Sequence, residues 1–213
     1  LDKGQMWIGT TTDGAYRLQL DKNELTHPIL KGNITSIYQD SEGELWIGSW
    51  EEGLHHVKTD GTIEIFEYDA KNPYSISSNF VRACCEDNLG NIWIGTFNGL
   101  NRYDKSTGLF QNHTASDAQS DGLTHSSIWC IVKDNQGTLW LGTYFGGVNY
   151  FNPEYEIYSR YMYSPIEKKG LSNPVVGRTI EDKDGNLWIG TEGGGLNYYN
   201  RRTREFKWFR PEI

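Results

Sequence analysis

The sequence predicts an all-β protein built from one repeated four-stranded unit. A short motif, best seen as Asp-Lys-Asp-Gly-Asn-Leu-Trp-Ile-Gly-Thr at 182–191, recurs in near-copies along the 213 residues. Its tryptophans are separated by 39, 47, 47 and 48 residues, a period that indicates a propeller or a solenoid. Helical periodicity is missing at useful length, whereas short strand-like runs alternate with turn signals. The recurring tryptophans are Trp7, Trp46, Trp93, Trp140 and Trp188.

The third repeat shows the unit most clearly. An extended run at 80–86 ends at Asp87, where Asp-Asn-Leu-Gly is typical of a tight turn because Asp caps the turn and Gly supplies a positive φ. Further strands are predicted at 91–97, 100–104 and 109–113, separated by turn residues. Each unit is therefore predicted to be a four-stranded antiparallel meander. The matching first strands of the other repeats are predicted at 34–39, 128–133 and 176–181.

The second strand of each unit carries Trp and Gly on one face and Ile or Leu on the other. Such a strand is covered on both faces, as happens when sheets stack radially like the blades of a propeller. The recurring glycine predicts a place where the neighbouring blade approaches the backbone closely, and the tryptophan predicts a bulky residue between blades. These glycines are Gly9, Gly48, Gly95, Gly142 and Gly190.

We therefore predict one domain over 1–213, a partial β-propeller of about five four-stranded antiparallel blades. The chain starts within a second strand, so the first blade is expected to lack its innermost strand and to belong to a longer array. The unpaired edge predicts either closure of a small ring or a homodimer formed through sheet edges. The expected blades are approximately 1–30, 31–70, 76–115, 124–163 and 171–213.

Composition excludes several classes of partner and site. The net charge of −8 and the lack of a basic stripe argue against nucleic acid. No run reaches the length of a membrane-spanning helix, so direct membrane insertion is not expected. We expect a cytosolic protein or a mature piece of an exported one. The five histidines and Cys84, Cys85 and Cys130 lack metal-ligand spacing, so no metal or other cofactor is expected.

The full unit reads Asp-x-x-Gly-x-Leu-Trp-Ile-Gly-Thr and then Gly-Leu-Asn-x-Tyr, as at 99–103 and 195–199. The segments 74–79 and 170–173 are similar to a Ser-Leu-Ser-x-Asn lead-in. The chain thus resembles the two-component regulator propeller repeat family, five times over and along nearly its whole length. That resemblance implies the periplasmic sensor region of a bacterial hybrid histidine kinase and response regulator, with further propeller blades in the parent chain. Many such regions detect oligosaccharides.

One candidate ligand site follows each Gly-Thr or Gly-Ser, where the loop from the second to the third strand begins. Aromatic side chains there would ring one face of the disc and stack on sugars, with a carboxylate to accept hydroxyl groups. The alternative is that these rings only pack between blades. The residues are Thr11, Trp50, Phe97, Tyr144 and Glu192.

A second candidate site lies on the first strands, nearest the channel. Arg82, Trp129 and Arg178 are large where other repeats have small residues, so they are candidates for ligand contact. A solvated channel lining or a structural salt bridge is the alternative. Counting back four or five residues from each turn aspartate gives two sets of first-strand positions. Their side chains point to opposite faces of the strand, so only one register set is expected to face a given surface. The sets are Ser36, Ala83, Cys130 and Arg178, and Thr35, Arg82, Trp129 and Gly177.

Three functions stay open at the level of sequence. The favoured one is a non-catalytic segment of an extracytoplasmic sensor that binds an oligosaccharide or another small ligand. The others are a propeller lyase or glycoside hydrolase and a purely structural interaction array. The segment 112–127 is read as a connector or as a lid. The turn aspartates Asp40, Asp87, Asp134 and Asp182 are read as structural, because every unit repeats them.

Overall fold

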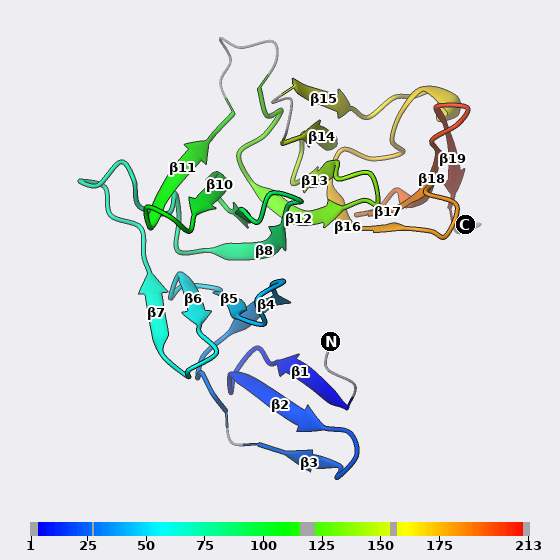
Figure 1. Cartoon of the computed structure of the whole chain (residues 1–213). Coiled ribbons are helices and arrows are strands. Elements are labelled where there is room, and N and C mark those ends of the chain that lie inside the picture. The colour runs from blue at the N-terminus through cyan, green and yellow to red at the C-terminus, as the bar shows by residue number, and fades with distance from the viewer. Residues whose placement is uncertain (1–3, 27, 116–121, 154–156, 211–213) are drawn as a thin grey trace.

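The computed structural model describes residues 4–26, 28–115, 122–153 and 157–210, and within them the chain forms five antiparallel sheets (Figure 1). The first sheet has three strands and each of the others has four, as the repeat predicts. One short 3-10 helix, η1 (Glu167–Lys169), is the only helix among the described residues. No helix in this part of the chain is long and apolar enough to cross a membrane.

Each sheet is a meander whose strands are hydrogen-bonded in chain order. The first and second sheets contain β1 (Gln5–Gly9), β2 (Ala15–Gln19) and β3 (Glu24–Leu25), then β4 (Ile34–Gln39), β5 (Leu45–Ser49), β6 (Leu54–Val57) and β7 (Ile63–Phe66). The third contains β8 (Val81–Glu86), β9 (Ile92–Thr96), β10 (Gly99–Asp104) and β11 (Leu109–His113). The fourth and fifth contain β12 (Ile128–Lys133), β13 (Leu139–Thr143), β14 (Val148–Asn152) and β15 (Ile157–Tyr161), then β16 (Val176–Glu181), β17 (Leu187–Thr191), β18 (Gly195–Asn200) and β19 (Glu205–Phe209).

The sheets are arranged as consecutive blades. Figure 1 shows them along an arc, with β1, β4, β8, β12 and β16 toward a common centre and the last strand of each sheet on the outside. Neighbouring blades touch through these inner strands, since β4 contacts β8, β8 contacts β12 and β12 contacts β16. This is the partial β-propeller predicted from the sequence.

The recurring tryptophans of the second, third and fourth blades pack between blades. Trp46 of β5 is fully buried in a cluster with Val81 and Ile94 of the next blade, and Trp93 packs in the same way with Ile128. Burial of such a large side chain against two sheets is a major part of the contact between blades. The predicted packing between blades is confirmed at Trp46 and Trp93, whereas the ring of Trp188 contacts Tyr198 and Phe209 of its own blade.

The recurring glycine lies where the next inner strand approaches most closely. A Cβ atom on Gly95 would lie 2.7 Å from Cγ2 of Ile128, and one on Gly142 would lie 2.6 Å from Cγ1 of Val176. A side chain does not fit such a gap without moving the neighbouring blade. At Gly190 the nearest atom would be 3.7 Å away, so that position is open. The predicted close approach of the neighbouring blade to the glycine backbone is confirmed at Gly95 and Gly142.

Each turn aspartate accepts hydrogen bonds both from the backbone of its turn and from the indole of the tryptophan that follows. Oδ1 of Asp134 accepts hydrogen bonds from the backbone N–H groups of Gln136 (2.8 Å) and Thr138 (2.9 Å). Its Oδ2 accepts one from Nε1 of Trp140 (2.7 Å). Because the same three bonds occur at Asp40, Asp87 and Asp182, these residues are structural, as the repeat predicts.

Candidate functional site: a cationic cavity at the centre of the blades

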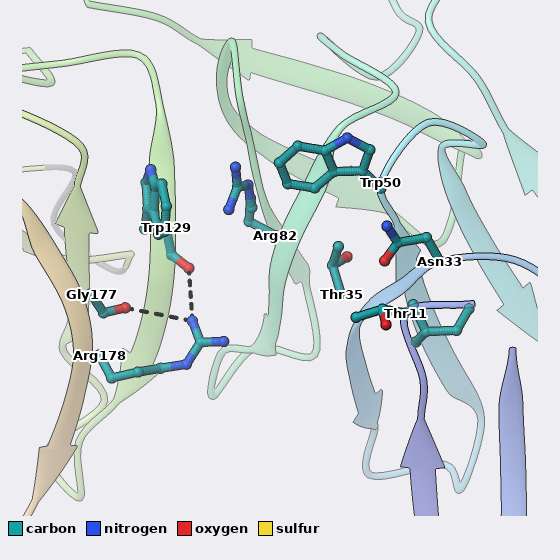
Figure 2. Close-up of a pocket in the computed structure, with 9 residues that line it drawn as sticks. Thr11, Asn33, Thr35, Trp50, Arg82, Trp129, Gly177 and Arg178 are labelled. Carbon is teal, nitrogen blue, oxygen red and sulfur yellow. Dashed lines mark hydrogen bonds between the residues drawn. The ribbon is translucent and has the colours of Figure 1, made fainter. Parts of the chain in front are cut away.

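A cavity of about 570 Å³ lies where the inner strands converge (Figure 2). All five sheets contribute to it, because its lining comes from the β1–β2 loop, from the ends of β4 and β5, and from β8, β12 and β16. Ligand sites usually have volumes of roughly 300–1,000 Å³, so the cavity has the size of a small-molecule site. Its lining residues are Thr11, Asn33, Ile34, Thr35, Trp50, Arg82, Trp129, Gly177 and Arg178.

A β-bulge in each of the inner strands β4, β8, β12 and β16 directs one residue into this cavity. The register shifts between Val81 and Ala83 in β8, and the same shift occurs in β4, β12 and β16. A bulge leaves one residue outside the regular pairing and re-aims its side chain. The four bulge residues all line the cavity, and they form one of the two predicted register sets: Thr35, Arg82, Trp129 and Gly177.

Arg178 departs from its own register set. Its counterpart Cys130 is buried and Ala83 packs against the core, so neither lines the cavity. Arg178 is exposed, and its Nη1 donates to the backbone oxygens of Trp129 (3.4 Å) and Gly177 (3.5 Å), as Figure 2 shows. The expectation that only one set faces the cavity is therefore wrong for Arg178, because its long side chain reaches back over the neighbouring strand.

Arg82 lies between two indole rings. Its guanidinium carbon is 4.4 Å from the centroid of Trp50 and 4.1 Å from that of Trp129. Both distances are within the range of cation–π attraction, so the rings hold the guanidinium in one orientation (Figure 2). Trp129 also stacks on Tyr144, with centroids 5.4 Å apart and planes at 10°. The charge is thus fixed by aromatic walls.

The charge on Arg82 has no counterion among the described residues. No ion pair or side-chain hydrogen bond of Arg82 occurs there, and its Nε is a buried donor without a partner. Nε1 of Trp129 is a second such donor. Burial lowers the pKa of Arg82, the positive charge of Arg178 lowers it further, and Tyr144 opposes these effects. Arginine stays protonated in proteins despite such shifts, so the cavity carries uncompensated positive charge.

Phe97 and Glu192, which also follow a Gly-Thr pair, do not line the cavity. Phe97 is 50% exposed and lies beside Phe80, with centroids 6.0 Å apart, and Phe80 in turn meets the edge of Trp50 at 5.6 Å. Glu192 is exposed and does not line the cavity. Sequence reasoning missed Phe80, because it precedes the inner strand and no repeat pattern marks it.

One cluster outside the cavity has the residue types of a cation site. Carboxylate oxygens of Asp40, Glu42 and Glu44 lie within 4.8 Å of one another. Lys105 donates to Asp40 (3.1 Å) and Glu42 (2.8 Å), and His56 pairs with Glu44 at 2.6 Å. Because Lys105 pairs with two of the carboxylates and His56 contacts the third, protein groups already occupy the positions of a cation.

The connector between β11 and β12 is described only in part. Residues 116–121 lie outside the described residues, so the choice between a lid and a connector stays open there. Next to them, the backbone N–H of Ala115 donates to Oγ of Ser126 at 3.0 Å. This bond joins the two ends of the connector.

These features define the class of protein: a partial β-propeller with an aromatic and cationic cavity at its centre. The sequence pattern of the two-component regulator propeller matches residues 28–51, 75–98, 122–145 and 170–193. The chain therefore carries four repeats of the two-component regulator propeller family. It has no match among curated proteins.

Solved structures with the same fold include two proteins from B. thetaiotaomicron, each described as the extracellular domain of a hybrid two-component system. One is 20% identical with a TM-score of 0.77, covering 97% of this chain and 28% of the other. The second is 21% identical with a TM-score of 0.72, covering 100% and 27%. Virginiamycin B lyase from Staphylococcus aureus is 15% identical with a TM-score of 0.73, covering 99% and 67%. The chain thus spans less than a third of the two extracellular domains.

Proposed function

We propose that this chain is a segment of the extracytoplasmic, ligand-sensing propeller of a hybrid two-component regulator, and that its central cavity binds an oligosaccharide without catalysis. The four repeats of this family and the similarity of fold to two extracellular domains support the sensor role. In the whole protein, further propeller blades would continue the array. A periplasmic location and a kinase elsewhere in the parent chain are parts of the same proposal.

The observation that carries the proposal is a cavity shared by all five sheets and flanked by indole rings. Trp50 is 36% exposed, so part of its ring is free to pack against the apolar face of a sugar. Asn33, Thr11 and Thr35 supply amide and hydroxyl groups suited to sugar hydroxyls. A ligand held by several blades at once would also link their relative positions, which is what a sensor needs.

The chemistry of the lining supports a binding role. The described lining contains two arginines, two tryptophans, one isoleucine and small or polar residues, but neither a histidine nor a carboxylate. General acid–base catalysis of glycoside cleavage or elimination usually needs such groups. The similarity in fold to virginiamycin B lyase nevertheless makes a propeller enzyme the second candidate. Product formation from a bound sugar would favour it.

Calorimetric titration of oligosaccharides into the intact sensor region tests the proposal. We expect heat of binding in the wild type, its loss in Trp50→Ala and its weakening in Tyr144→Ala. Tyr68→Ala is the matched control, because Tyr68 is an exposed aromatic residue in the loop after β7 and should leave binding unchanged. Equal heat in the wild type and in Trp50→Ala would contradict a site in this cavity. Turnover measured on the same samples would identify an enzyme.

A further inference from the structure

We propose that Arg82 and Arg178 form an anion subsite in the central cavity, so that the ligand carries an acidic group, either a carboxylate or a sulfate ester. This inference rests on the proposed binding function, because it concerns the same cavity. It adds the chemical class of the ligand, which neither the fold nor the repeat motif specifies.

The first argument is the distribution of charge. The chain has 28 acidic and 20 basic residues, yet the charged side chains of the described cavity lining are Arg82 and Arg178 alone. Walls of one sign concentrate the field inside a cleft and attract ligands of the opposite sign. In an acidic protein, a cavity lined by two cations is a local reversal of charge.

The second argument is a comparison with Arg201, another partly buried arginine that lies over an indole ring between blades. Arg201 lies over the ring of Trp140 at 5.3 Å, and its Nη2 is 2.8 Å from Asp134 and 3.6 Å from Glu181. Lys105 pairs with carboxylates in the same way. Arg82 has an aromatic neighbour on either side but no carboxylate among the described residues. An anionic ligand would give Arg82 the charge compensation that Asp134 and Glu181 give Arg201.

The third argument is the geometry of the donors. The two indoles fix the plane of the Arg82 guanidinium, whose Nε is buried without a partner, and Nε1 of Trp129 is a second unsatisfied donor beside it. A fixed guanidinium presents N–H groups in the spacing that matches two oxygens of a carboxylate or sulfate. Arg178 is anchored through Nη1 to two carbonyl oxygens, so it adds charge at a defined place. The Nη groups of Arg82 would donate to the acidic oxygens, since its Nε and the Nε1 of Trp129 are covered by protein atoms.

The position of Arg82 also argues against a purely neutral ligand. Because the guanidinium lies over the rings of both Trp50 and Trp129, a sugar that enters between them must share that space with a positive charge. A neutral sugar would displace part of this stacking without compensating the charge. A uronate or a sulfated sugar would form the ion pair while its ring packed on the exposed part of Trp50.

Nuclear magnetic resonance of the indole N–H groups tests the subsite with simple probes: galacturonate, its uncharged methyl ester, and galactose 6-sulfate. We expect both anions to shift the signals of Trp50 and Trp129, with an affinity at least about tenfold above that of the ester, and this preference to fall as salt rises. Response to galacturonate alone would identify a carboxylate ligand, and response to the sulfate alone a sulfated one.

Variants separate this inference from the proposed function. Arg82→Gln with Arg178→Gln should abolish the preference for anions, whereas Arg202→Gln, in the exposed turn between β18 and β19, should keep it. Thermal unfolding of each variant serves as the control that the fold is retained. Equal shifts with the ester and the acid would overturn the anion subsite and leave a neutral sugar site standing. No shift with any probe would overturn both.

Discussion

Arg201 and Arg82 lie in similar aromatic surroundings but in opposite electrostatic ones. Arg201 covers the ring of Trp140 near the outer turns, and Asp134 and Glu181 neutralise it. Arg82 covers two rings at the centre, where none of the described carboxylates pairs with it. A paired cation between blades stabilises the array. An unpaired cation in a cavity is costly by itself, and such cost is common at binding sites.

The same contrast holds for the tryptophans, and it predicts the largest difference in stability. Trp46 is fully buried between two blades and donates to Asp40 at 2.9 Å, whereas Trp50 lies at the cavity rim and is 36% exposed. Trp46→Ala should lower the free energy of unfolding by about 3–5 kcal/mol, because it removes a buried ring and leaves a cavity. Trp50→Ala should lower it by less than about 1 kcal/mol. Denaturant unfolding measures both, and similar losses would contradict the division between packing and binding residues.

Two of the recurring glycines test whether close packing between blades stabilises the array, because Gly95 and Gly190 occupy the same motif position in different surroundings. Gly95→Ala should lower the free energy of unfolding by about 1–3 kcal/mol, because its Cβ would overlap Ile128. Gly190→Ala occupies the same motif position but meets no atom closer than 3.7 Å, so its effect should lie within about 0.5 kcal/mol of zero. Thermal unfolding compares the two. If Gly190→Ala were as destabilising as Gly95→Ala, the close approach of blades would not explain the motif.

The outer arginine provides a smaller test. Arg201→Met keeps most of the contact with Trp140 but leaves the buried carboxylate of Asp134 without its ion pair. Because Trp140 and two backbone N–H groups still donate to Asp134, the expected loss is about 1–2 kcal/mol rather than the larger loss of an isolated buried charge. Denaturant unfolding of the wild type and of Arg201→Met measures this loss. A variant as stable as the wild type would contradict a stabilising role for the ion pair between Arg201 and Asp134.

Much of this fold follows from the sequence because the same motif recurs along the chain and each of its residues has a local physical role. The turn aspartate, the buried tryptophan and the close-packed glycine each have a local cause, and the predicted ends of β4, β12 and β16 agree with the structure. The candidate site was less accessible to this reasoning. Trp50, Arg82, Trp129 and Arg178 were singled out because they depart from the repeat, and all four line the cavity.

What the sequence did not show is how these residues come together. The β-bulge at Gly177 has no signature in the motif. Counting along an ideal strand placed Arg178 on the opposite face from Gly177, but its long side chain reaches back to the backbone of Trp129 and lines the same cavity. Whether the guanidinium of Arg82 has a carboxylate partner depends on contacts between blades, which no pattern within one repeat encodes. Phe97 and Glu192 share the motif position of Trp50, yet loop geometry leaves both outside the cavity lining.

The thermal unfolding midpoint of Arg82→Met, with and without an acidic sugar, tests the central claim most directly. Without ligand, we expect the variant to unfold at the same temperature as the wild type or higher, because the substitution removes an uncompensated charge from an aromatic cavity. With galacturonate or galactose 6-sulfate added, only the wild type should gain stability. A variant that unfolds several degrees below the wild type and gains as much from the anion would show that Arg82 is a structural residue. That result would contradict the proposal that the central cavity binds an acidic ligand.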